Sequence, residues 1–170
     1  MVEDAVVAAR RDASHGARVL RTWRRLSGVP GGAWLFSRSV GWMAPYTGSI
    51  RARVMSVEPG RAELQLRDRR RVRNHLRSIH AIAIANLGEL ASGLAVLTAM
   101  PRDVRGIPTA IHVVYTKKAR GTLTAVGTAA LPPVENEASA EAAAEVTDEA
   151  GDTVATIRVE WRLERVDGRP

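Results

Sequence analysis

The chain has 170 residues, a length that suits one ordinary domain with a substantial hydrophobic core. It contains no cysteine, which excludes disulfide frameworks, thiolate metal sites and a cysteine nucleophile, and which is compatible with a reducing cytosol. The formal net charge of +7 is uneven, because residues 1–80 hold 16 arginines and 6 acids whereas residues 134–166 hold 9 acids and 3 arginines. A basic excess is typical of proteins that bind nucleic acid, an anionic membrane surface or a phosphate-bearing ligand, so charge alone does not select the partner.

The first part of the chain predicts two helices. Residues 12–26 predict a helix with Ser14 as its N-cap, because apolar residues recur on one face between arginines. A second, short helix is expected over residues 33–41. The tryptophans and the phenylalanine of these helices are interpreted as packing residues: Trp23, Trp34 and Phe36.

The N-terminus lacks the apolar region of a secretory signal, so we expect a cytoplasmic protein. We assign residues 1–45 to a helical extension packed on the domain, residues 46–166 to the domain itself, and residues 167–170 to a tail.

From Ile50 onward the hydrophobic period changes to two, which predicts strands. Residues 50–66 predict a hairpin that turns at Glu58-Pro59-Gly60, and a basic, irregular loop follows over residues 68–79. Further strands are expected after the central helix, over residues 109–117, 123–131, 140–148 and 153–166. Runs of strands on both sides of one helix favour an α+β fold with an antiparallel sheet.

The central helix is expected over residues 80–100. It has the length of a membrane span, but Asn86, Glu89 and Ser92 lie near its middle, which favours a buried helix of a soluble domain. These three residues form one polar stripe. A lone carboxylate at Glu89 is desolvated there, so its pKa should rise unless a partner opposes the shift. The alternatives are a functional acid and a structural acid paired with an arginine at a subunit contact.

The start of this helix offers a second feature. The first backbone N–H groups, near Ala81 and Ile82, lie at the positive end of the helix dipole and are suited to hold an oxyanion. Ser78 is equally explained as a plain N-cap. The histidines of this region, His75 and His80, and the later His112 lack metal-ligand spacing, so no metal site is expected.

The stretch from Asn74 to Ala95 resembles the hotdog thioesterases of the phenylacetate-pathway (PaaI-like) superfamily. Their motif has an asparagine, a His-Gly-Gly whose histidine lies six residues later, and an Asp or Glu nine residues after the histidine. Asn74, His80 and Glu89 have this spacing. Four further segments resemble a branch of the superfamily with an extra N-terminal helical segment: residues 23–27, 32–36, 44–48 and 117–125. The resemblance implies a hotdog fold, in which a curved antiparallel sheet wraps a long central helix.

The resemblance also implies hydrolysis of an acyl-CoA or acyl-carrier thioester at a dimer interface. Carried onto this sequence, Glu89 is the base or nucleophile, the Ala81 N–H is an oxyanion donor, and Asn74 positions the nucleophile or substrate. His80, at the start of the helix, completes the expected catalytic set. A homodimer or a dimer of dimers is expected, with no cofactor other than the CoA of the substrate.

Other residues are candidates for binding the substrate. On the central helix they are Ile82, Asn86 and Ser92, and basic residues suited to CoA phosphates flank it: Arg73, Lys117, Lys118 and Arg120.

The sequence departs from the motif, since Ala81-Ile82 replaces the glycine pair and Arg77 stands where the loop often has a glycine. These departures favour an alternative, a non-catalytic acyl-CoA-binding or sensing protein. A third hypothesis is that the basic N-terminal helices contact nucleic acid or an anionic membrane. These helices show no helix-turn-helix pattern, and their aromatic residues are interpreted as packing residues.

Overall fold

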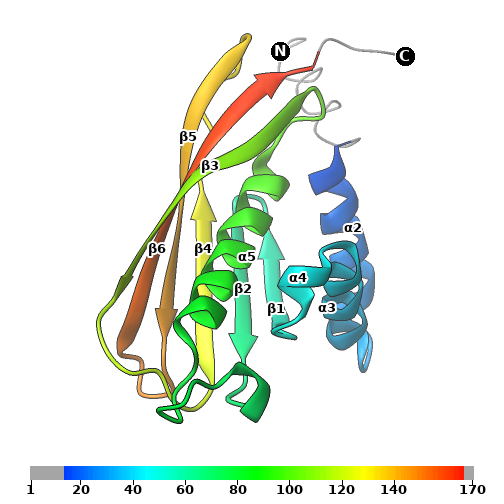
Figure 1. Ribbon diagram of the computed structural model, residues 1–170. Coiled ribbons are helices and arrows are strands. Elements are labelled where there is room, and N and C mark those ends of the chain that lie inside the picture. The colour runs from blue at the N-terminus through cyan, green and yellow to red at the C-terminus, as the bar shows by residue number, and fades with distance from the viewer. Residues whose placement is uncertain (1–13, 167–170) are drawn as a thin grey trace.

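A curved antiparallel sheet wraps around one long helix in the computed structural model, which describes residues 14–166 (Figure 1). The helices are α2 (His15–Ser27), α3 (Gly32–Met43), α4 (Pro45–Gly48) and α5 (Ala81–Ala99), with a short 3-10 turn at Arg70–Val72. The strands are β1 (Arg53–Glu58), β2 (Arg61–Leu66), β3 (Val104–Tyr115), β4 (Leu123–Ala129), β5 (Glu137–Thr147) and β6 (Thr153–Arg165). They form one six-stranded sheet in the order β1-β2-β4-β5-β6-β3, and every neighbouring pair is antiparallel. The predicted α+β arrangement is therefore confirmed.

Helix α5 packs into the concave face of the sheet, mainly against β4, β2 and β5. Leu87, Ala91 and Ala95 are completely buried along its sheet-facing side. The approach is close because β4 has a glycine at the crossing point: a Cβ on Gly127 would lie 2.2 Å from the carbonyl carbon of Ala91. On the helix, Gly88 plays the matching part against Ile157 of β6.

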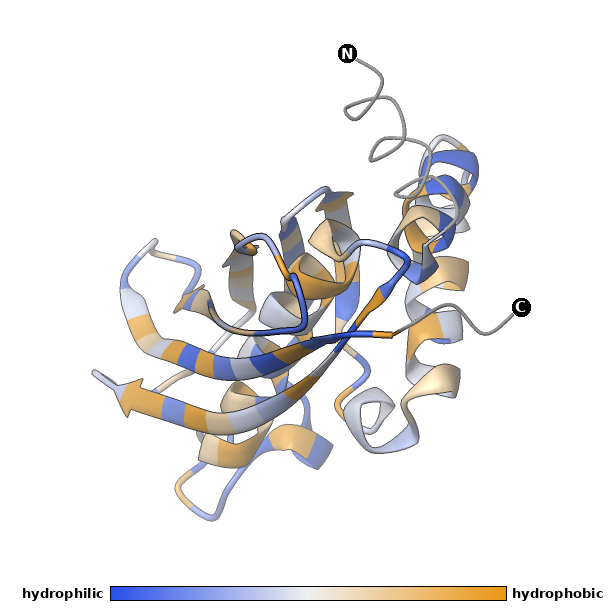
Figure 2. Cartoon of the chain, turned by 90° about the horizontal axis from the view of Figure 1, so that it is seen from above, coloured by the Kyte–Doolittle hydropathy of each residue, from blue (hydrophilic) through white to orange (hydrophobic). Residues whose placement is uncertain are grey.

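Strand β6 shows the alternation that its sequence predicts. Ile157, Val159 and Leu163 are buried, whereas Arg158 and Glu160 are exposed. The same period appears in Figure 2 as alternating hydrophobic and hydrophilic bands along the strands. One face of the sheet therefore supplies the core and the other remains polar.

Two strands that follow the central helix begin earlier than predicted. Strand β3 begins at Val104 rather than at residue 109, and β5 begins at Glu137 rather than at residue 140. The first part of β3 was not predicted because Pro108 argues against a strand. The missing N–H of Pro108 is tolerated because β3 is an edge strand and its pairing with β6 is irregular between Pro108 and Ala110.

The hairpin turn is confirmed, with Gly60 in the left-handed region at φ 74°. Strand β1, however, begins at Arg53 and not at Ile50. The reason is local, because Arg51 has a φ of 50°, which interrupts the extended backbone before the strand starts.

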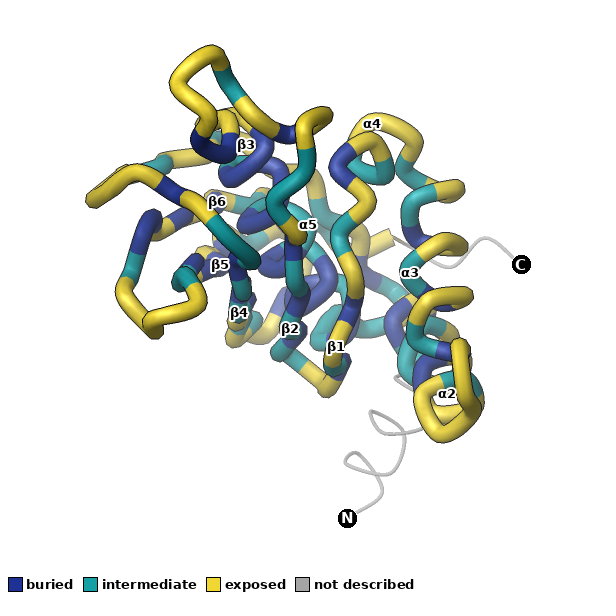
Figure 3. Tube along the Cα trace, turned by 90° about the horizontal axis from the view of Figure 1, so that it is seen from below, coloured by how far each residue is buried: buried dark blue, intermediate teal, exposed yellow. Residues whose placement is uncertain are grey.

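The N-terminal helices pack on one another and on the domain. Ser14 caps α2 as predicted, since its hydroxyl accepts a hydrogen bond from the Ala17 N–H at 2.9 Å. Trp23 and Phe36 meet edge to face at 5.1 Å between ring centroids, which confirms them as packing residues. Trp34 is different: it is 61% exposed, so the prediction that it packs inside was wrong. Figure 3 shows the exposed outer side of α2 and α3.

The boundary of the helical extension at residue 45 stays a prediction. The structure adds the short helix α4 just after it, which the sequence did not predict. The predicted helix start at residue 12 and the predicted tail lie outside the described residues.

Helix α5 alone, among the described residues, has the length and composition of a membrane span. Its most apolar window is 61% buried inside the fold, which identifies it as the core helix around which the sheet closes.

We predict that Gly127→Ala lowers the free energy of unfolding by about 2 kcal/mol or more. The added methyl group would collide with backbone atoms of α5, which cannot rotate away as a side chain can. Gly28→Ala is the control: nothing lies within 4 Å of a Cβ there, and its φ is −83°. Chemical denaturation of both variants measures the effect. Equal stability of the two would contradict the close helix–sheet contact.

Candidate active site

The loop before α5 is held by the side chain of Asn74. Its Oδ1 accepts hydrogen bonds from the Leu76 N–H at 2.9 Å, the Ser78 N–H at 3.2 Å and the Ser78 hydroxyl at 3.1 Å. Within this turn Arg77 has a φ of 55°. Such a backbone favours glycine, the residue that the resemblance places in the loop. Asn74 thus shapes the loop through its oxygen, while its amide nitrogen makes no hydrogen bond to another described residue.

His80, and not Ser78, is the N-cap of α5. Its Nδ1 accepts a hydrogen bond from the Ile82 N–H at 3.1 Å, so the ring proton lies on Nε2. The interpretation of Ser78 as the cap was wrong, because its hydroxyl is turned to Asn74 instead.

The cap leaves one of the two candidate oxyanion donors available and occupies the other. The Ile82 N–H is engaged by the imidazole, whereas the hydrogen bonds among residues 14–166 do not use the Ala81 N–H. The carbonyl of Ala81 accepts a hydrogen bond from the Tyr115 hydroxyl at 2.9 Å, which fixes the end of β3 to the start of α5. Tyr115 was missed in the sequence because only the tertiary fold brings it to the helix.

Glu89 lies two turns further along α5 and is partly buried. Burial raises the pKa of its carboxyl group above the usual value, with no neighbouring charge opposing the shift. No ion pair to Glu89 is formed within the described part of the chain. Gly93, one turn on, leaves room beside the acid, since a Cβ there would lie 3.7 Å from Oε1. In the single chain Glu89 is therefore a partly desolvated acid without a salt bridge.

The polar stripe of the helix separates into two kinds of residue. Asn86 is buried, donates weakly to the Tyr46 carbonyl at 3.5 Å, and keeps its Oδ1 buried without a partner. Ser92 is completely buried and donates to the carbonyls of Gly88 and Glu89 at 2.9 and 3.1 Å. Its expected contact with substrate is therefore not supported. Ile82, by contrast, is 54% exposed at the helix start.

The loop of residues 116–122 lies beside the helix start, because the Ile79 N–H donates to the Ala119 carbonyl at 2.9 Å. Lys117 in this loop is already bound by two carboxylates, Asp148 and Asp152, each at 2.7 Å. The carboxylate of Asp148 raises the pKa of Lys117 through a hydrogen bond.

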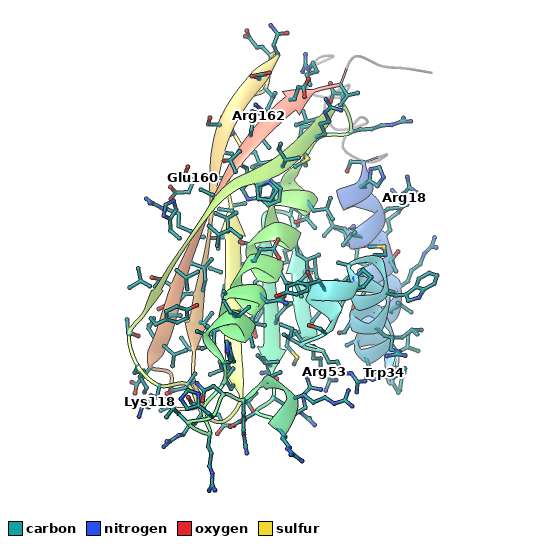
Figure 4. The ribbon with its side chains drawn as sticks, in the orientation of Figure 1. Arg18, Trp34, Arg53, Lys118, Glu160 and Arg162 are labelled. Carbon is teal, nitrogen blue, oxygen red and sulfur yellow. The ribbon has the colours of Figure 1, made fainter. Side chains whose placement is uncertain are left out.

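Among the other predicted phosphate ligands, Arg73 is paired with Asp68 at 2.6 Å. Lys118, which is labelled in Figure 4, and Arg120 are exposed. Neither forms an ion pair within the described residues. Of the four predicted cations, these two alone are unpaired. Within residues 14–166, no three His, Asp or Glu side chains gather as a metal site would require.

A long helix wrapped by a curved antiparallel sheet, with a partly buried acid on the helix and a capped turn at its start, defines a hotdog-fold domain. Comparison places the chain more narrowly: it belongs to the family described as domain of unknown function DUF4442, whose profile matches residues 32–163. Among curated proteins, no sequence is similar enough to count as a relative.

Solved structures share the fold. A structural-genomics protein, APC5556, is 26% identical, with a TM-score of 0.75 over 87% of this chain and 98% of its own. The Pseudomonas aeruginosa protein PA5026, described as a probable thioesterase, is 21% identical, with a TM-score of 0.66 over 81% of this chain and 97% of its own. The E. coli PaaI protein from the phenylacetic acid degradation operon is 17% identical, with a TM-score of 0.63 over 80% and 94%.

We predict that Glu89→Gln stabilises the protein at neutral pH. Since the folded-state pKa is raised, ionisation of Glu89 weakens the fold as the pH rises from the ordinary carboxyl range to the raised pKa, and the cost persists above it. The variant cannot ionise, so the gain should vanish below about pH 4. Thermal unfolding across this range measures it, and Glu135→Gln, in an exposed loop, controls for the lost charge. A gain of the same size at low pH would contradict the desolvation.

Proposed function

We propose that the protein hydrolyses acyl thioesters, with Glu89 as the catalytic base or nucleophile. The observation that carries the proposal is the partly buried, unpaired carboxyl of Glu89, nine residues after the histidine that caps the same helix. Acids with perturbed pKa values are concentrated at catalytic sites. The fold is shared with PA5026, which is described as a probable thioesterase, and this likeness supports the same class of chemistry.

The geometry suits a simple hydrolytic step. Ionised Glu89 removes a proton from water, the hydroxide attacks the thioester carbonyl carbon, and the oxygen becomes an oxyanion. The Ala81 N–H at the positive end of α5 is the proposed donor for it. Because Ala81 and Glu89 lie about 12 Å apart along α5, the acid and the donor that act on one thioester come from two paired copies of the chain. When the tetrahedral species collapses, the C–S bond breaks and the protonated Glu89 returns its proton to the thiolate. The products are a carboxylic acid and a free thiol, and the thiol carrier is either CoA or an acyl-carrier protein.

We further propose that two copies pair through strand β3. This edge strand is twelve residues long and exposes several large apolar side chains, whereas β1 at the other edge has six residues and lies against α3. A long apolar edge is a ready template for pairing with a second chain. Tyr115 connects this edge to the start of α5, so pairing there would close the site. The exposed apolar residues of β3 are Ile107, Ile111, Val114 and Tyr115.

A non-hydrolytic acyl-CoA-binding protein is the second candidate. It is favoured by Ile82, whose exposed side chain stands where the motif has glycine, and by the occupation of its N–H by His80. Ligand-induced stabilisation without thiol release would select this function over hydrolysis.

We predict that the protein releases thiol from at least one member of a panel of acyl-CoA and acyl-carrier thioesters. Glu89→Ala should lower kcat/KM by about 10²-fold or more, while Glu135→Gln keeps the parent activity. Because Glu89 must be ionised and its pKa is raised, kcat/KM should fall on acidification at a pH above that expected for an ordinary carboxylate. Absence of turnover across the panel, or full activity of Glu89→Ala, would reject the proposal.

We predict that the double variant Ile111→Lys/Val114→Lys shifts the protein from dimer to monomer in sedimentation experiments, because it places charges on the apolar edge. Both side chains are about half exposed or more in the single chain, so the fold of the monomer should tolerate the change. Val29→Lys, at an equally exposed apolar residue on the α2–α3 connection, is the control. An unchanged mass in the double variant would exclude β3 as the interface.

A further inference from the structure

A second cavity lies on another side of α5, between helices α3 and α4 and the adjoining ends of β1 and β2. Its volume is about 770 Å³, and Leu90 of α5 contributes to its wall. Successive residues on an α-helix point about 100° apart, so Leu90 and Glu89 face different sides of α5. Glu89 itself is not among the residues that line the cavity.

The cavity is lined by five arginines from three stretches of the chain: Arg38, Arg51, Arg53, Arg67 and Arg69. None of its described lining residues is an aspartate or glutamate, and none of the five forms an ion pair with another described residue. In a chain with 23 arginines an exposed guanidinium is ordinary, but five around one cavity without a counter-charge are not. The cavity thus concentrates uncompensated positive charge.

Arg69 shows the cost of this arrangement. One terminal nitrogen donates to the Ile50 carbonyl, whereas its Nε is buried without a hydrogen-bond partner. Burial lowers the pKa of Arg69, and the neighbouring positive charges of Arg51 and Arg71 lower it further. A buried N–H of a charged group without an acceptor is unfavourable, and an anion bound in the cavity would offset the repulsion among these guanidinium groups.

Two exposed tryptophans complete the cavity. Trp34 and Trp42, both on α3, are 61% and 86% exposed, in contrast to Trp23 at 8%. Trp34 and Arg53 appear at the same end of the molecule in Figure 4. Indole faces beside guanidinium groups suit a ligand that has both a flat or apolar part and negative charge.

We propose that this arginine-lined cavity binds a ligand carrying two or more phosphate groups. A guanidinium group can donate two hydrogen bonds to the oxygens of one phosphate. Because the cavity has five guanidinium groups, a single negative charge would not neutralise it. The ligand is either the phosphate-bearing half of a CoA thioester or a separate phosphorylated molecule. The CoA reading rests on the proposed function, whereas binding of inorganic pyrophosphate is measured without turnover, so failure of this site and failure of the proposed hydrolysis are distinguishable.

The test is calorimetric titration of the full chain with inorganic pyrophosphate, inorganic phosphate and CoA at about 0.15 M ionic strength, where long-range attraction is screened. Pyrophosphate should bind more tightly than phosphate. Arg53→Gln/Arg67→Gln, which changes two exposed side chains, should weaken binding of pyrophosphate and CoA by about tenfold or more. Arg18→Gln/Arg24→Gln on α2 removes the same charge from two exposed residues that do not line the cavity and should change binding less than about twofold. Arg18 is labelled in Figure 4.

The source of the phosphates follows from a second readout. If the cavity variant also raises the KM for acyl-CoA with kcat unchanged, the ligand is the CoA half of the substrate; if pyrophosphate binding falls while KM is unchanged, it is a separate molecule. Both results support the proposal. It is overturned if no phosphorylated probe binds, if the two double variants behave alike, or if the cavity variant loses only sedimentation with phosphatidylcholine vesicles containing phosphatidic acid. That last result assigns the cavity to a membrane surface.

Discussion

The contact between helix α5 and strand β4 at Gly127 sets the geometry on which the rest of the structure depends. With no side chain at this point, the helix backbone lies directly against the sheet, and the neighbouring strands curve around it. The sheet-facing positions of α5 must then be small or apolar, as Gly88, Ala91 and Ala95 are. Glu89 lies on another side of the helix and is only partly buried. This burial raises the pKa of its carboxyl group.

The elements that were predicted well are those whose signal is local. The apolar run of α5 and the strict alternation of β6 each indicate which of their residues are buried, without knowledge of the neighbouring elements. The errors came where context decides. Pro108 argues against a strand until the sheet order makes β3 an edge, and Arg51 and Arg77 give no sign in the sequence that their backbones are left-handed. Trp34 has a large apolar side chain of the kind usually found in a core, but it is exposed on its helix.

The candidate site divides in the same way. Asn74, His80 and Glu89 belong to one continuous segment, so their spacing was enough to group them. Their individual bonds were not predictable, since Asn74 and Ser78 bind one another and leave the cap to His80. Tyr115, by contrast, reaches the site from a strand that follows the helix, and a sequence without its fold carries no signal for that contact.

The distribution of charge along the chain becomes a distribution in space because of the sheet order. Acids of the C-terminal half form ion pairs within their own part of the sheet: Glu141 pairs with Arg158 and Glu164 pairs with Arg105. Strand β4 separates these strands from β1 and β2, so the acids do not reach the arginines on the other side. The basic excess of the first half therefore has no counter-charge at hand where α3 meets β1 and β2. A positive region of this kind attracts anions to a surface and increases their rate of encounter. The positive electrostatic potential where α3 meets β1 and β2 therefore depends on the order of the strands as well as on the number of arginines.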